Sequence, residues 1–208
     1  MPGGSGFVTF LIIGVTCVVS FMGFSNPRLV SKLILWPPAI TRGKEYWRLV
    51  SCGLIHADVP HLLFNMITLY FFGQLVEYFY SAMIGPIGYL LFYVGGLAVS
   101  AWPSWHEHRN DSGYRSLGAS GAVSAVLFSF ILMRPWSTIL VFFVPMPAIL
   151  YAVLYIGYSI YMDRQRSDNI NHSAHLWGAL YGVVATCLVN WHVLPMFFAQ
   201  LLRPLSPH

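Results

Sequence analysis

A serine between glycines opens one of the apolar segments of the chain. Residues 116–125 read SLGASGAVSA, which places Ser120 between Gly118 and Gly121. At a helix start, a serine lies beside exposed backbone N–H groups and the positive end of the helix dipole, and both stabilise an oxyanion. The motif is not the G-x-S-x-G elbow of α/β hydrolases, because Ala122 replaces the last glycine. Ser120 is therefore a candidate nucleophile, and close helix packing by small residues is the alternative explanation.

A histidine in the last apolar segment could act as the base. His175 lies three residues before Gly178, and Gly178 and Gly182 form a G-x-x-x-G face. Such a face predicts close approach to another small face, and Gly121 and Ala125 provide one on the segment of Ser120. That approach would bring the Ser120 hydroxyl within hydrogen-bond reach of the His175 ring. No carboxylate stands at a spacing that would complete a triad, so the sequence predicts a Ser–His dyad.

Two further polar side chains share one helix face in the second apolar segment. His61 and Asn65 are four residues apart, so their side chains point the same way. We expect them to hold the developing oxyanion together with the backbone N–H of Ser120. The alternative is that they join neighbouring helices by hydrogen bonds. Glu77, on the same segment, is expected to be either a buried tie or an interface charge, with no role in the reaction.

Composition determines where such a site would lie. Of the 208 residues, 57% are hydrophobic and 9% are charged, against about 25% charged residues in a soluble domain. This excludes a soluble or disordered protein. A formal charge of +4 without a basic cluster gives no reason to expect nucleic acid as a partner. The three cysteines are too scattered for a disulfide framework or a metal knot.

Uncharged runs of helical length predict an all-α polytopic membrane protein, a six-transmembrane-helix bundle in one domain over residues 1–208. Phe7–Phe24 is expected to be a span and not a signal peptide, because Met1–Gly6 carry no Lys or Arg. Residues 25–57 are expected to form an interfacial loop. Helices are predicted near 7–24, 59–80, 84–103, 119–134, 137–162 and 173–192.

Several motifs in order resemble the rhomboid family of intramembrane serine proteases. They are Trp47-Arg48, His61-x-x-x-Asn65, Gly118-x-Ser120-Gly121 and Ala174-His175-x-x-Gly178-x-x-x-Gly182. The resemblance implies a rhomboid-like six-helix core, a Ser–His dyad, no cofactor and no metal. It also implies cleavage of single-pass transmembrane proteins within the lipid bilayer. We expect an integral, multi-pass protein of the cell (inner) membrane.

The chain departs from the family at one residue near the candidate nucleophile. Family members often carry an aromatic residue four positions after the nucleophile, which stacks on the catalytic histidine, and here that position is Ser124. The orientation of His175 must therefore come from elsewhere.

The distribution of charge raises a question of membrane topology. Nine of the eleven Lys and Arg lie on the side of the first loop, with Arg134 and Arg203 on the other. The positive-inside rule places that loop in the cytoplasm, whereas the resemblance implies that it lies outside, and we follow the resemblance.

Two other classes of function remain as alternatives. One is a catalytically inactive rhomboid-like protein that binds transmembrane helices, although such relatives usually lack the nucleophile or the base. The other is a metal site or a transporter built from histidines. It would use His56, His61, His172 and His175 together with the His106-x-His108 loop. The chain has no H-E-x-x-H motif, and carboxylates are scarce in its apolar segments.

Overall fold

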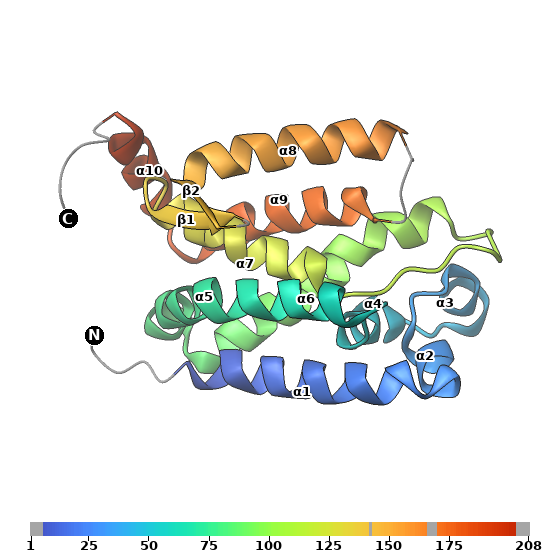
Figure 1. Cartoon of the computed structure of the whole chain (residues 1–208). Coiled ribbons are helices and arrows are strands. Elements are labelled where there is room, and N and C mark those ends of the chain that lie inside the picture. The colour runs from blue at the N-terminus through green and yellow to red at the C-terminus, as the bar shows by residue number, and fades with distance from the viewer. Residues whose placement is uncertain (1–5, 142, 166–169, 203–208) are drawn as a thin grey trace.

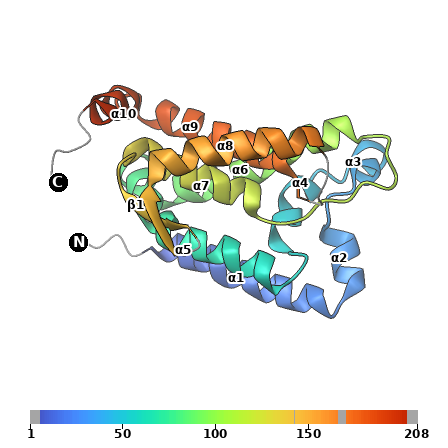
Figure 2. The same cartoon turned by 45° about the horizontal axis from the view of Figure 1, so that its top comes forward.

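The structure is a computed structural model that describes residues 6–141, 143–165 and 170–202. It consists of helices and one two-stranded hairpin (Figures 1 and 2). The first part of the chain forms α1 (Phe7–Phe24), α2 (Pro27–Leu33), α3 (Pro37–Gly43), α4 (Arg48–Ser51) and the 3-10 helix η1 (Cys52–Leu54). The rest forms α5 (Val59–Ile84), α6 (Pro86–Glu107), α7 (Ser120–Met133), β1 (Thr138–Val141), β2 (Val144–Pro147), α8 (Ala148–Gln165), α9 (His172–Val189) and α10 (Val193–Leu201).

Helix α7 is the centre of the bundle. Every residue from Gly121 to Leu132 is buried, because α5, α6 and α9 all pack against this helix (Figure 1). Helix α1 packs on α5, and α8 packs on α9 and α7 at the opposite side of the bundle. A helix that is apolar all round is expected at such a position. The first residue of α7, Ser120, therefore lies inside the bundle.

The long helices give the chain the character of a multi-span membrane protein. Helices α1, α5 and α6 are each long and apolar enough to cross a bilayer. Helices α9 and α10 qualify together as a pair bent by 115°. Helix α7 has 14 residues and is shorter than these spans. The described residues thus contain three or four candidate spans by length and composition.

The segment before α8 differs from the prediction. One helix was predicted over 137–162, but Thr138–Val141 and Val144–Pro147 pair as antiparallel strands, and α8 begins only at Ala148. Pro145 and Pro147 explain the difference, since proline lacks the N–H that a helix interior needs and clashes with the preceding turn. The other predicted boundaries lie within four residues of those in the structure. Two cations counted for the topology, Arg166 and Arg203, lie outside the described residues.

The predicted loop 25–57 is largely helical and is tied to the segment that leads to Ser120. Arg48 is buried, and its guanidinium donates hydrogen bonds to the carbonyls of Ser31 and Ile34 at 2.9 and 2.8 Å. Arg48 also pairs with Glu45. Leu35 and Ser116 exchange two backbone hydrogen bonds of 3.0 and 3.2 Å. These contacts hold the approach to α7 from one side.

Glu77 is a buried tie between α5 and α1. Its two carboxylate oxygens accept the backbone N–H groups of Val8 and Thr9 at 3.0 and 2.8 Å. These groups belong to the first turn of α1, where backbone N–H groups have no partner within the helix and the dipole favours a negative charge. The carboxylate of Glu77 on α5 thus provides hydrogen-bond acceptors for two backbone N–H groups at the start of α1, within an otherwise apolar interface.

Candidate active site

Ser120 and His175 are in direct contact. The Oγ atom of Ser120 lies 2.8 Å from Nε2 of His175. Ser120 is the first residue of α7, and His175 lies in the first turn of α9. Both side chains are partly exposed. A hydroxyl and an imidazole at this distance have the geometry of a nucleophile and its general base.

The contact exists because α7 and α9 approach each other at their glycines. A Cβ atom on Gly178 would overlap the carbonyl oxygen of Gly121, and one on Gly182 would overlap the carbonyl oxygen of Ala125. The G-x-x-x-G face therefore meets the small face of α7, as small residues allow in membrane helices. Any side chain larger than hydrogen at these positions would push α9 away from α7 and His175 away from Ser120.

Asn171 fixes the start of α9, one turn before His175. Its Oδ1 accepts the backbone N–H of Ala174 at 2.9 Å, which is an N-cap interaction. Its Nδ2 donates to the Ser104 hydroxyl at 2.8 Å and to the Tyr114 hydroxyl at 3.2 Å. One side chain therefore ties α9 both to α6 and to the loop between α6 and α7.

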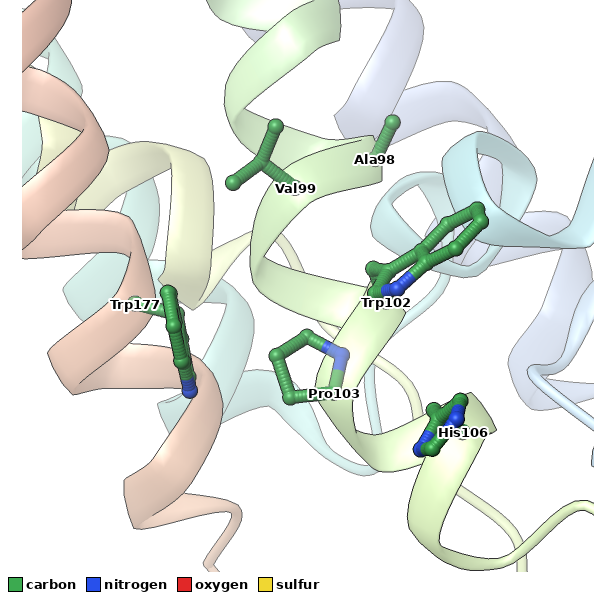
Figure 3. Close-up of a pocket in the computed structure, with 6 residues that line it drawn as sticks. All are labelled: Ala98, Val99, Trp102, Pro103, His106 and Trp177. Atoms are coloured by element: carbon green, nitrogen blue, oxygen red, sulfur yellow. The ribbon is translucent and has the colours of Figure 1, made fainter.

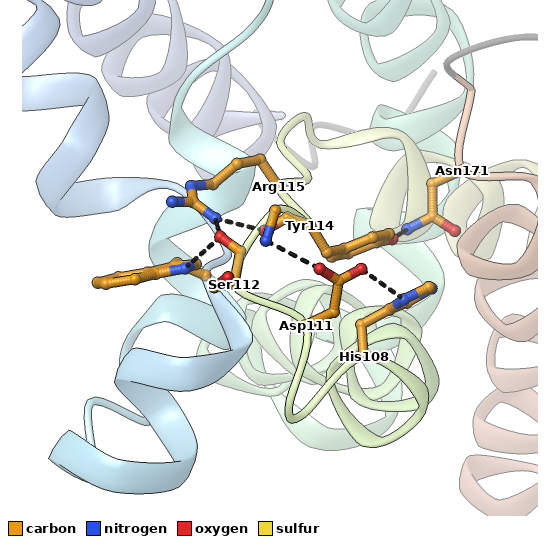
Figure 4. Close-up of polar contacts among 8 residues, drawn as sticks. His108, Asp111, Ser112, Tyr114, Arg115 and Asn171 are labelled. Carbon is orange, nitrogen blue, oxygen red and sulfur yellow. Dashed lines mark hydrogen bonds and ion pairs between the residues drawn. The ribbon is translucent and has the colours of Figure 1, made fainter.

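That loop is itself held by a polar network. The ring of His108 stacks on Tyr114, with centroids 3.8 Å apart, and its Nδ1 lies 3.7 Å from a carboxylate oxygen of Asp111 (Figure 4). The Arg115 guanidinium donates to the Ser112 carbonyl at 2.7 Å (Figure 4). Burial raises the pKa of Tyr114, so its hydroxyl keeps its proton, and the hydroxyl oxygen accepts the N–H of Asn171. The network thus supports the N-terminus of α9 from outside the dyad.

The His61 ring lies against the backbone just before Ser120. Gly118 has a φ of +114°, which L side chains rarely adopt, and a Cβ atom there would come within 2.7 Å of Cε1 of His61. Only glycine gives the chain both this turn and room for the imidazole. The N-cap interaction between the Asp58 carboxylate and the His61 N–H, at 2.7 Å, fixes the first turn of α5.

Asn65 uses part of its donor capacity inside its own helix. It is buried, and its Nδ2 donates to the carbonyl of His61 at 2.8 Å. An amide nitrogen carries two N–H groups, so a second one can serve another acceptor. Leu62 and Met66, the next residues along α5 after His61 and Asn65, belong to one buried cluster with Ala119 and Val123. This cluster keeps the face of α5 against the start of α7.

His56 joins three segments at the same place, and the sequence motifs gave it no defined role. Its Nε2 accepts the backbone N–H of Ala119 at 3.2 Å, so Nδ1 carries the proton and donates to the Ser20 hydroxyl at 2.9 Å. Ser20 in turn donates to the Leu54 carbonyl at 2.9 Å. Burial, with a smaller effect from His61, lowers the pKa of His56 to about 4 although Asp58 opposes it. This series of hydrogen bonds requires a neutral His56 ring, and the neutral ring is the form present near pH 7.

The histidines do not assemble into a metal site within the part of the chain that the structure describes. There, no three His, Cys, Asp or Glu side chains are placed to hold one metal ion. His56 and His61 lie edge to face with ring centroids 4.9 Å apart, and His172 and His175 do so at 5.8 Å. The pairs stand at the starts of different helices.

An apolar pocket lies between α6 and α9 (Figure 3). Trp177 of α9 faces α6 across it, and Figure 3 shows Trp102, Pro103 and His106 along the α6 side. Neither Ser120 nor His175 is among its lining residues. Apart from His106, its lining residues have apolar or aromatic side chains.

Comparison with known proteins matches residues 43–192 to the Rhomboid domain. This match covers all of the predicted site residues, and it confirms the resemblance drawn from the motifs. The chain is 27% identical to "Putative rhomboid protease YdcA" of Bacillus subtilis over 87% of each protein. It is 25% identical to "Rhomboid protease GlpG" of Haemophilus influenzae over 84% of this chain and 86% of that protein.

A third relative is longer than this chain. "RHOMBOID-like protein 12, mitochondrial" of Arabidopsis thaliana is 34% identical over 66% of this chain, but the match spans only 44% of that protein. The chain thus covers less than half the length of this plant relative and most of the length of the two bacterial ones.

Proposed function

The chain belongs to the rhomboid family, and from this we propose that it is an intramembrane serine endopeptidase. In this proposal, Ser120 and His175 form the catalytic dyad and the substrates are transmembrane segments of other membrane proteins. The observation that carries it is the 2.8 Å contact between Ser120 Oγ and His175 Nε2 at the start of a buried helix. The whole chain acts as one rhomboid-like membrane domain.

The first chemical step uses the dyad directly. Nε2 of His175 takes the hydroxyl proton while Oγ of Ser120 attacks the scissile carbonyl carbon. The protonated His175 then donates that proton to the leaving amine, which breaks the peptide bond and leaves an acyl ester on Ser120. A water molecule, deprotonated by His175, hydrolyses the ester and regenerates both residues.

The tetrahedral intermediate carries a negative charge that needs fixed donors. We assign this role to the backbone N–H of Ser120 and to the side chains of His61 and Asn65. The contact of His61 with Gly118 and the second N–H of the Asn65 amide support this assignment. Donors that are already in position cost no reorganisation in the transition state, and this makes them effective.

Helices α1, α5 and α6, and the bent pair α9 and α10, are long and apolar enough to cross a bilayer, and this supports a membrane setting. We propose that α1, α5, α6, α7, α8 and α9 are the six membrane helices of a multi-pass protein in the cell (inner) membrane. The 14 residues of α7 rise about 21 Å, which is less than the roughly 30 Å of a hydrocarbon core. If the far end of α7 lies near one membrane surface, Ser120 lies below the other surface. There, substrate helices can reach Ser120 laterally through the bilayer, and water can reach it from one side of the membrane.

Covalent labelling and cleavage test the proposal together. We expect a fluorophosphonate to label the purified protein, and the label to disappear in Ser120→Ala but to persist in Ser112→Ala, a change at an exposed loop serine. Reconstituted protein should also cleave a single-pass transmembrane substrate without added metal. A protein that binds such helices but neither reacts with the probe nor cleaves would instead be the inactive, helix-binding relative. Cleavage that persists in Ser120→Ala would refute the dyad.

A further inference from the structure

The dyad hydrogen bond alone does not fix the plane of the His175 ring. One bond from Nε2 to Ser120 Oγ defines a direction, but the last torsion of a histidine side chain is broad. Efficient proton transfer needs the ring held close to one orientation. A second contact must therefore define the plane.

Tyr155 of α8 makes that contact. Its ring lies nearly parallel to the ring of His175, with an interplanar angle of 23° and centroids 6.0 Å apart. This is within the range of offset stacking between aromatic rings. His172 approaches from the preceding turn of α9, with its ring at 76° to that of His175 and centroids 5.8 Å apart. The His175 imidazole thus has the face of one ring and the edge of another beside it.

The Tyr155 ring is itself held in place from α7. Its hydroxyl lies 2.6 Å from the hydroxyl of Ser124, and its ring packs on Phe128 at a centroid distance of 5.5 Å. Ser124 is one helical turn after Ser120, so both serines lie on the same face of α7. The three helices are therefore connected in a ring of side-chain contacts. Ser120 on α7 contacts His175 on α9, His175 contacts Tyr155 on α8, and Tyr155 contacts Ser124 on α7.

We propose that Tyr155 is the positioning residue for His175, and that the hydrogen bond with Ser124 fixes the position of the Tyr155 ring. The proposal rests on the proposed function, since it assigns His175 as the base. It also explains how a short serine can stand at position 124: the aromatic ring comes from a neighbouring helix and the serine anchors it. Because α8 buries only Ala148, Ala152 and Ser159 among its described residues, the orientation of the base depends on a helix at the outside of the bundle.

Three variants separate the ring from its anchor. Tyr155→Leu removes the ring, Tyr155→Phe keeps the ring without its hydroxyl, and Ser124→Ala removes only the anchor. Tyr161→Leu is the matched control, because it makes the same change at a tyrosine of α8 that is 58% exposed. Cleavage of a reconstituted transmembrane substrate gives kcat and KM for each, and the fluorophosphonate labelling rate reports Ser120 directly.

We expect Tyr155→Leu to lower kcat and the labelling rate by between about ten- and a hundredfold with KM nearly unchanged. Tyr155→Phe and Ser124→Ala should each lower kcat by at most about fivefold. The double variant should lower kcat no further, because both substitutions remove the same hydrogen bond, the one between the hydroxyls of Ser124 and Tyr155. Unchanged kcat in Tyr155→Leu, an equal loss in Tyr161→Leu, or a rise confined to KM would overturn the proposal.

A spectroscopic measurement distinguishes this outcome from a failure of the proposed function. The His175 ring lies nearly parallel to the Tyr155 ring at a centroid distance of 6.0 Å, so the ring current of Tyr155 should shift the NMR signals of the carbon-bound protons of His175. The signals that disappear in His175→Ala are those of His175. Those signals should move in Tyr155→Leu and stay in Tyr155→Phe and Tyr161→Leu, even in a protein that cleaves nothing. Signals that stay in place in Tyr155→Leu would overturn the positioning role whether or not the protein is a protease.

Discussion

Nε2 of His56 accepts the backbone N–H of Ala119 at 3.2 Å, one residue before the candidate nucleophile. The imidazole can accept there only while Nε2 is unprotonated. A proton on Nε2 would place two donors against each other at the start of α7. The position of Ser120 is thus coupled to the protonation state of a buried histidine that takes no part in the proposed reaction.

We predict that acid destabilises the protein through His56. Burial lowers the pKa of His56 to about 4 in the folded state, while the unfolded value is about 6.5. Between these values the unfolded state binds the proton and the folded state does not, so stability falls as pH drops from about 6.5 towards 4. At pH 5 the loss is at most about 2 kcal/mol. Thermal unfolding in detergent at pH 7.5 and pH 5 measures it.

His56→Gln should remove this part of the pH dependence, because its side chain does not titrate. The exposed His106 offers a control, and His106→Gln should keep the wild-type difference between the two pH values. An identical pH response in His56→Gln and wild type would contradict the prediction.

The dyad predicts non-additive kinetics. Ser120→Ala and His175→Ala should each abolish cleavage, because each removes one half of the same proton-transfer pair, and the double variant should be no worse than either single one. Single-turnover cleavage in proteoliposomes checks this, with circular dichroism to show that each variant keeps its helices. A double variant far slower than both singles would mean that the two residues act independently.

The oxyanion assignment predicts where the kinetic loss appears. His61→Ala and Asn65→Ala should each lower kcat by on the order of a hundredfold with a small change in KM, since donors to an oxyanion act in the transition state. Phe64→Ala is a useful comparison, because Phe64 lies between them in sequence and its side chain is 55% exposed. If the loss in the His61 and Asn65 variants lay in KM alone, these residues would belong to substrate binding.

The glycine contacts predict opposite effects of one substitution at two positions. Gly178→Ala adds a methyl group that overlaps the Gly121 carbonyl, so it should destabilise the protein by about 1–3 kcal/mol and slow cleavage. Gly157→Ala on α8 meets nothing within 4 Å and should be neutral or stabilising by up to about 1 kcal/mol. Unfolding midpoints and cleavage rates of the two variants decide the matter, and equal stability would refute the contact.

The sequence predicted the helices that carry the candidate site, because helix periodicity and membrane solvation act over short stretches of chain. His61 and Asn65 share a face by their spacing, and Gly178 and Gly182 share one for the same reason. The start of α7 near Ser120 was also predictable from local composition. The family match to residues 43–192 agrees with these motifs.

Contacts between distant segments needed the tertiary structure. Sequence composition suggested a helix from 137 to 162, but the prolines before Ala148 and the pairing of Thr138–Val141 with Val144–Pro147 produce a hairpin. The role of His56 depends on Ser20, which lies 36 residues earlier, and on Ala119, 63 residues later. No local pattern encodes such pairings, because they depend on how whole helices pack.

The residue types and spacings by themselves determined the chemistry available to this protein: a serine at a helix start, a histidine beside a glycine face, and a chain apolar enough for a membrane. The small faces of two segments also predicted that Ser120 and His175 approach each other, but only the tertiary structure decided which other side chains meet them. It brought Tyr155 of α8 to His175 of α9 and to Ser124 of α7. The physical reason is that ring stacking and hydrogen bonds require contact within a few ångströms, and the packing of whole helices sets those distances.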